Sequence, residues 1–255
     1  MISKLVEDLS QKLARGFPRS RKKLAVELVP VVVGLKTASL IDSLLLSRKD
    51  ANLLADCLAG IDPTLLVVFE EVSGQTLVVN RNLLDELLAQ EIIFVEVGGN
   101  SPRQLPSRPD SFVDLLAQIT STSLSISFLA LTLTDPERPQ ALITLVGYLL
   151  DYSVAYSFVQ ERADGKNCLG GIELVLVEAS LVDDSGLGER ARLLSFSYPA
   201  SLVSDTPSLQ PLTTTFNLRG KLEGRLSRAS RFSSGPSNCR IEVESKIVVL
   251  DQVAL

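Results

Sequence analysis

Hydrophobic and polar residues alternate along the chain with two different spacings. Between Ile2 and Leu13 the apolar residues recur every three or four positions, which predicts an amphipathic helix that Gly16 and Pro18 end. Short continuous apolar runs rich in Val, Ile and Phe, such as residues 65–70, are typical of strands buried on both faces. The pattern therefore predicts a chain in which helices and strands follow each other in turn.

The same spacings divide the rest of the chain into elements. Helices are predicted at residues 2–13, 24–35, 47–59, 80–88, 110–120, 141–150 and 209–231. Strands are predicted at residues 38–42, 65–70, 76–79, 92–97, 123–131, 152–159, 172–182, 193–198 and 241–250. A glycine-containing turn at residues 71–75 joins two of these strands as a hairpin.

The order of these elements predicts an α/β fold. We expect a single domain with a mixed, mostly parallel sheet flanked by helices. Strands in the C-terminal third follow one another closely, so they are expected to pair antiparallel and to extend one edge of that sheet. Residues 1–23 are predicted as an N-terminal helix and basic connector, and residues 24–255 as the single α/β domain.

Histidine is absent from the 255 residues. Its absence excludes Ser-His-Asp and Cys-His nucleophile pairs, histidine metal sites and the usual proton shuttle at neutral pH. Cys57, Cys168 and Cys239 show no paired spacing, which favours a reducing compartment, the cytoplasm or the nucleus. The sequence shows neither a secretory signal nor an apolar segment suited to a bilayer, so no integral membrane association is expected.

The net charge of −5 conceals two basic segments. Residues 15–23 contribute +5 and residues 219–231 contribute +4, so the remaining residues must carry −14. An acidic body repels nucleic acid unless the two basic segments lie together, and aromatic residues do not alternate with the basic ones. We therefore expect no nucleic-acid partner, a solvated connector at residues 15–23 and a solvated helix face at residues 219–231.

Several segments, taken together, resemble one protein family. They are residues 33–42 (VGLKTASLID), 93–97 (IFVEV), 147–158 (GYLLDYSVAYSF), 167–169 (NCL), 194–199 (LSFSYP) and 248–255 (VVLDQVAL). Their order and spacing resemble the uncharacterised eukaryotic family that contains the chromosome 1 open reading frame 74 protein. The resemblance implies membership of a family that has no assigned activity, cofactor or catalytic residue.

Three acidic residues stand where strands are predicted to end. Asp42, Glu96 and Asp135 would meet at one edge if their strands were parallel neighbours. Asp42 and Glu96 would then be candidate metal ligands, and Asp135 a ligand or catalytic base, in a site suited to Mg²⁺ and a substrate phosphate. The alternative is that these residues are solvated, paired or turn-forming, because acids commonly follow strands in loops.

Two further features carry candidate chemistry. Gly98 and Gly99 follow a predicted strand and could bind a cofactor's anionic group through their backbone N–H groups. Cys168 lies two residues after Lys166, whose charge would favour a reactive thiolate, so it is a candidate catalytic residue. The alternative for Cys168 is a partly buried thiol that packs as a small hydrophobic residue. No P-loop, dinucleotide-binding or α/β-hydrolase motif occurs.

Two functions of different classes follow from these observations. The first is a binding or adaptor module whose aliphatic surface or sheet edge contacts a protein partner. The second is a carboxylate-dependent, magnesium-assisted enzyme that acts on a phosphorylated or nucleotide-like small molecule.

Overall fold

The computed structural model describes residues 2–133, 140–158, 167–183, 190–229 and 239–253. The helices are α1 (Ile2–Leu13), α2 (Arg21–Val32), α3 (Arg48–Ala59), α4 (Leu84–Leu88), α5 (Asp110–Thr120), α6 (Ala141–Leu149) and α7 (Pro211–Ala229), with short 3-10 helices at Arg81–Leu83, Ala200–Leu202 and Pro207–Leu209. The strands are β1 (Ala38–Leu40), β2 (Leu65–Glu70), β3 (Thr76–Asn80), β4 (Ile93–Glu96), β5 (Arg103–Gln104), β6 (Phe128–Leu131), β7 (Val154–Ser157), β8 (Glu173–Asp183), β9 (Arg190–Pro199) and β10 (Cys239–Val249). Each predicted helix and strand has a counterpart in the structure, and the two-residue strand β5 is an addition.

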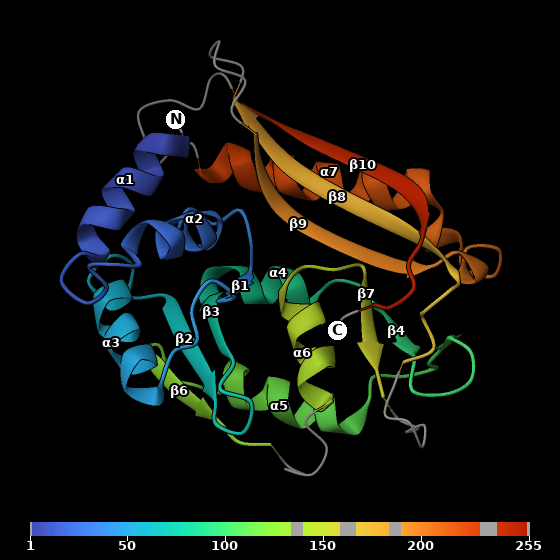
Figure 1. The fold of residues 1–255 in the computed structure, drawn as a ribbon, viewed down its shortest axis with the longest axis horizontal. Helices are drawn as coiled ribbons and strands as arrows, with labels where there is room; N and C mark the ends of the chain where they lie inside the picture. Colours follow the sequence, from blue (N-terminus) through green and yellow to red (C-terminus); the bar gives the residue numbers. More distant parts are fainter. Residues whose placement is uncertain (1, 134–139, 159–166, 184–189, 230–238, 254–255) are drawn as a thin grey trace.

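The fold class is α/β, as predicted, in a single domain. In the described part of the chain the strands form three sheets, in the orders β1-β3-β2-β6, β5-β4-β7 and β10-β8-β9 (Figure 1). Strand β2 pairs parallel with β6 and β4 pairs parallel with β7, and the other pairs are antiparallel. Parallel pairing is therefore less frequent than expected.

The C-terminal strands are antiparallel, as expected, but they form a sheet of their own instead of extending the edge of another. Strand β10 pairs with β8 along its whole length, from Cys239 opposite Asp183 to Val249 opposite Glu173. These strands are 10 or 11 residues long, whereas those of the first sheet have three to six. The central strand β8 pairs on both sides, with β10 and with β9, so the three long strands form a sheet without an edge of the first one.

The first sheet is buried on both faces, which explains why its strands are apolar without interruption. In β2, Leu65 and Val67 pack with helices α1, α2 and α3, while Leu66 and Val68 pack with α5 and α6. Alternate side chains of a strand point to opposite faces, so one run of six buried residues contributes to two hydrophobic cores.

The strand predicted at residues 123–131 begins only at Phe128. The guanidinium of Arg81 donates hydrogen bonds to the carbonyl oxygens of Ser123 (2.8 Å) and Leu124 (3.0 Å), and also to that of Pro63 (2.9 Å). These backbone oxygens are thus occupied by a side chain, and the ladder with β2 starts after them.

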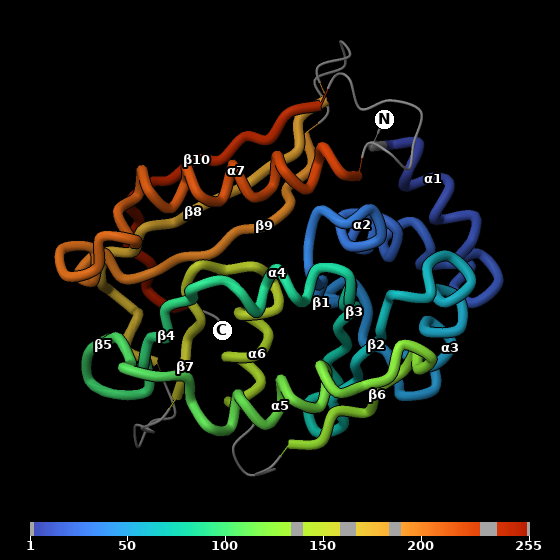
Figure 2. Tube along the Cα trace, turned by 180° about the vertical axis from the view of Figure 1, so that it is seen from behind, coloured from blue at the N-terminus to red at the C-terminus, as the bar shows by residue number. Residues whose placement is uncertain are grey.

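Helix α7 runs along one face of the C-terminal sheet, as the two opposite views show (Figures 1 and 2). Its Leu218 and Leu222 are buried in the same core as Val177, Ile241 and Val243. Since α7 also contacts β10 directly, the helix and the edge strand together form one side of the molecule.

Candidate functional site

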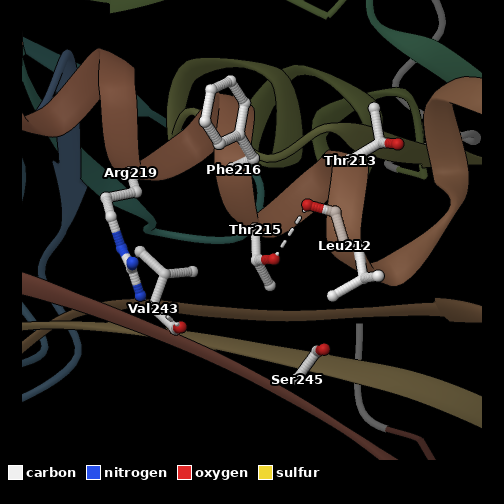
Figure 3. Close-up of a pocket in the computed structure, with 7 residues that line it drawn as sticks. All are labelled: Leu212, Thr213, Thr215, Phe216, Arg219, Val243 and Ser245. Carbon is white, nitrogen blue, oxygen red and sulfur yellow. Dashed lines mark hydrogen bonds between the residues drawn. The ribbon is translucent and has the colours of Figure 1, made fainter.

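A groove lies between the N-terminal half of α7 and strand β10. It has a volume of about 680 Å³. Its lining residues are Leu212, Thr213, Thr215, Phe216 and Arg219 on α7, and Val243 and Ser245 on β10 (Figure 3).

The groove exists because α7 covers only part of the β10 face. Odd-numbered side chains of β10 share one face of the strand, and Ile241 and Val243 on that face are buried. Further along the same face, Ile247 is 63% exposed and Val249 is 58% exposed. The cover ends at Ser245, so the second half of the strand presents apolar side chains to solvent.

The first turns of α7 also present large apolar side chains to solvent. Leu212 is 85% exposed and Phe216 is 79% exposed. Two of the polar groups beside them make contacts within the groove: Thr215 Oγ1 donates to the carbonyl of Leu212 at 3.1 Å, and Arg219 Nη2 donates to the carbonyl of Val243 at 3.3 Å. The surface that remains is mainly apolar.

Strand β10 is an edge strand. It pairs with β8 on one side, and within the described residues no strand pairs with its other side. An unpaired edge of 11 residues exposes backbone donors and acceptors to which a further strand can pair. We define the outer edge of β10 together with the α7/β10 groove as the edge groove.

The other face of α7 is fixed by a buried ionic network centred on Asp151. Arg225 donates from Nη1 to Asp151 Oδ2 at 2.8 Å and from Nη2 to Oδ1 at 3.1 Å, and Lys221 Nζ lies 2.8 Å from Oδ1. Thr37 donates to the same carboxylate from its backbone N–H (2.7 Å) and its hydroxyl (2.9 Å). All of the acceptor capacity of Asp151 is therefore used.

Arg225 extends the network to two further elements. It donates to the carbonyl of Leu35 at 3.1 Å and to Glu86 Oε1 at 2.8 Å, and Glu86 also pairs with Arg228. Burial alone would raise the pKa of Asp151, but the positive charges of Lys221 and Arg225 outweigh it and hold that pKa well below its ordinary value. Arg225 is only 1% exposed, so the expected solvated helix face at residues 219–231 is wrong at this position.

Lys36 lies beside this network without an ion pair to any described residue. Burial lowers the pKa of Lys36. The carboxylates of Asp151, Asp42 and Glu27 oppose this shift, which places all three close enough to act on the amine.

The three predicted carboxylates occupy different surroundings. Asp42 is exposed just after β1 of the first sheet, and Glu96 is fully buried at the end of β4 in another sheet. Asp135 lies outside the described residues. Within the described residues no group of three or more His, Cys, Asp or Glu side chains could hold a metal ion. The magnesium site that includes Asp135 stays a prediction.

A hydrogen bond joins the backbone of Gly98 to the side chain of Glu96. The backbone N–H of Gly98 donates to Glu96 Oε1 at 2.9 Å, so the chain's own carboxylate occupies one of the N–H groups considered for an anion. Positive φ angles occur at Gly34, Gly74 and Gly171, and neither Gly98 nor Gly99 is among them. Anion binding by Gly98 and Gly99 stays a prediction.

Cys168 is buried in the core that contains the C-terminal sheet. Its side chain is part of that hydrophobic cluster, and its backbone N–H donates to the carbonyl of Val97 at 2.9 Å. Lys166, whose charge carried the hypothesis of a reactive thiolate, lies outside the described residues. The catalytic role of Cys168 also stays a prediction.

The comparison with protein families gives one match. A family model described as a domain of unknown function (DUF4504) matches residues 8–219. The chain belongs to this family. The matched segment ends before Lys221 and Arg225, so the DUF4504 match covers Asp151 but not its two charged partners. No curated protein and no solved structure matches the chain.

In the part of this DUF4504 chain that the structure describes, the helices are too short or too polar to cross a bilayer.

No sequence motif indicates the buried network, but the distribution of charged residues along the chain does. Between residues 139 and 160, Asp151 is the one charged residue in an otherwise apolar or neutral stretch. A carboxylate in such a stretch needs a buried cation or several donors, so a partner could have been expected. Which cation it is, Arg225 or another, depends on tertiary structure alone.

Proposed function

We propose that the chain is a binding module that takes an extended apolar segment of a protein partner along the edge groove. The observation that carries this proposal is the unpaired outer edge of β10, flanked by the exposed side chains of Phe216 and Ile247. Surface apolar residues that gather beside an open sheet edge are a common basis of strand addition.

The chemistry of the edge groove indicates which segments it accepts. A segment that pairs with β10 gains main-chain hydrogen bonds, and every second side chain turns towards the α7 face. On that face it meets Leu212, Phe216 and Val243, so these alternate positions should be apolar. The volume of about 680 Å³ lies within the range of sites that bind compact ligands or several side chains.

The opposite face of β10 influences the intervening positions of the segment. This face carries two acidic residues flanked by two basic ones at the even-numbered positions, in the order Arg240, Glu242, Glu244 and Lys246. A matching segment should carry both positive and negative charges at its intervening positions.

Selection of peptides on the full chain tests the proposal. The probe is a displayed library of random extended peptides, counter-selected on the Phe216→Ser/Ile247→Thr variant. We expect selected peptides with alternating apolar residues and at least about tenfold weaker binding to the variant, because apolar side chains at a binding surface contribute about 1 kcal/mol or more each.

The matched control is Leu45→Ser, which changes a side chain 85% exposed outside the edge groove. It should leave peptide affinity unchanged. Peptides that bind the groove variant and the full chain equally, or peptides without alternation, would contradict the proposal.

The compartment and the closer family relationship are further proposals. We propose that the protein acts in the cytoplasm or the nucleus, supported by the three cysteines, none of which forms a disulfide. We also propose that DUF4504 includes the family containing the chromosome 1 open reading frame 74 protein, supported by the segments quoted above.

A further inference from the structure

We infer that the segment received by the edge groove is β10 of a second copy of this chain, paired antiparallel about a two-fold axis at Ser245. This inference rests on the proposed function, since it names the occupant of the same edge. It follows from the order of side chains along β10, which is complementary to itself in this register.

The apolar, odd-numbered faces of the two β10 strands are complementary in this register. An axis at Ser245 places Val243 of one copy opposite Ile247 of the other, and Ile241 opposite Val249. In each pair, one side chain is buried within its own copy and the other is exposed, Ile247 by 63% and Val249 by 58%. Cross-strand aliphatic pairs of this kind stabilise a sheet, and here they remove the two exposed side chains from solvent.

The charged face is complementary in the same register. Glu244 of each copy lies opposite Lys246 of the other, which gives two pairs of opposite charge. Among the described residues of one copy, the ion pairs of these side chains are long contacts across the sheet, Glu244 with Arg190 at 3.5 Å and Lys246 with Glu178 at 3.5 Å. Both remain mostly exposed, at 67% and 63%, so they are accessible to a second copy.

Neighbouring registers are less favourable. An axis at Val243 places Glu242 opposite Glu244 and Arg240 opposite Lys246, and all of these contacts are between like charges. An axis at Glu244 gives two Glu242–Lys246 pairs, but it also places the two copies of Glu244 directly against each other, a repulsion that the Ser245 register avoids. Like charges opposite each other destabilise a strand pair, so the charges favour Ser245 as the centre.

The groove supports the same arrangement. Val243 lines the groove, and in this register the partner's Ile247 lies directly opposite it. That side chain therefore extends along the α7 face next to Phe216, and the sheets of the two copies join into one through the paired edges. Main-chain hydrogen bonds between the two strands then satisfy the outer edge of both copies.

Charge exchange tests the inference in the full chain. Sedimentation equilibrium over a wide range of concentration should show a dimer for the unchanged protein. Glu244→Lys and Lys246→Glu each replace two attractive pairs by two repulsive ones, so each should weaken the dimer by about tenfold. The double variant Glu244→Lys/Lys246→Glu should dimerise as the unchanged protein does.

The double variant separates this pairing from effects within one copy. Inside each copy the exchange places a lysine at position 244 beside Arg190 and a glutamate at position 246 beside Glu178, so both contacts become repulsive. If these residues acted only within one copy, the double variant would therefore be the least stable of the three variants. Recovery of the dimer in the double variant supports pairing between copies. A dimer that neither single exchange weakens would overturn the register.

Cross-linking gives a second measurement that does not depend on charge. Ser245→Cys places two thiols opposite each other at the axis, within the separation that a disulfide spans. Mild oxidation should therefore give a covalent dimer in high yield, whereas the exposed control Ser121→Cys at the C-terminal end of α5 should give no more than the unchanged protein with its three native cysteines.

The two proposals fail in distinguishable ways. A protein that stays monomeric at all concentrations, while groove-dependent peptides bind, overturns the second copy as occupant and leaves the binding module intact. A dimer that responds to charge exchange, with no peptide selected, supports the inference and removes the separate protein partner. A monomer that selects no peptide overturns both.

Discussion

Arg225 makes two hydrogen bonds to Asp151, a residue 74 positions earlier, and neither side chain is exposed to solvent. Asp151 lies two residues after the end of α6. Its backbone has a positive φ of 68°, a conformation that few residues other than glycine adopt. The contacts with Arg225, Lys221 and Thr37 hold the carboxylate in this position. The pair thus joins α7 to the turn after α6 and, through Thr37, to the start of β1.

Removal of one partner of this pair should be strongly destabilising. Arg225→Ala leaves the Asp151 carboxylate buried with less positive charge, which should cost about 3–5 kcal/mol of unfolding free energy, measured by urea titration. The control is Arg228→Ala, since Arg228 is 57% exposed and its ion pair with Glu86 should contribute less than about 1 kcal/mol. Equal losses in the two variants would contradict the assigned role of Arg225.

The same pair predicts a dependence on acid. The pKa of Asp151 lies below its ordinary value of 3.8, so the folded state releases this proton more readily than the unfolded state does. Its contribution to stability is complete above that ordinary value and is lost as the pH falls below it. Unfolding free energies measured along an acid series should fall less steeply for Asp151→Asn than for the unchanged protein. Identical slopes would refute this linkage.

Lys36 predicts a second rise of stability with pH, in alkali. Burial lowers the pKa of its amine below the ordinary value of 10.5, so the unfolded state holds this proton more firmly. Stability should therefore rise with pH until the ordinary pKa is reached, and Lys36→Met should remove this rise. At neutral pH the variant should be more stable than the unchanged protein by up to about 1 kcal/mol, because it lacks the partly buried ammonium that has no ion pair among the described residues. A less stable variant with an unchanged pH slope would show that the amine has a favourable partner.

Two glycines should respond in opposite directions to alanine. Gly224 lies in α7 with open space around the position of a Cβ, so Gly224→Ala should stabilise the protein by about 0.5–1 kcal/mol. At Gly170 a Cβ would lie 2.5 Å from the backbone oxygen of Asp251, so Gly170→Ala should destabilise by about 1–3 kcal/mol. Thermal unfolding of both variants gives the comparison, and a stable Gly170→Ala protein would show that the segment after β10 can move away.

Local pattern and turn chemistry were sufficient to predict most elements of the fold. Ser47 caps α3 with Asp50 in a reciprocal capping box, and the 71–75 turn joins β2 to β3, because both depend on neighbouring residues alone. The division into three sheets was not predictable in this way. It depends on which strands of unequal length pair, such as β8 with β10, and the sequence pattern does not specify partners.

The sequence predicted the type of candidate site but not its location. An aliphatic surface or an open edge was expected from composition, but its place between α7 and β10 depends on where α7 stops covering Ser245 and Ile247. Likewise Arg225 has the same sequence surroundings as its exposed neighbour Arg228, and only packing separates a buried ion partner from a surface charge. Such differences are tertiary, so residue spacing does not contain them.

The distance between Asp151 and Arg225 along the chain also orders the steps of biosynthesis. When Asp151 leaves the ribosome, both of its cationic partners have still to be translated, and the buried place of its carboxylate is without compensating charge. The ionic network around this carboxylate is therefore completed only once residues 221 and 225 have been added. Helix α7, which carries both cations, acts as the closing element of the nascent protein.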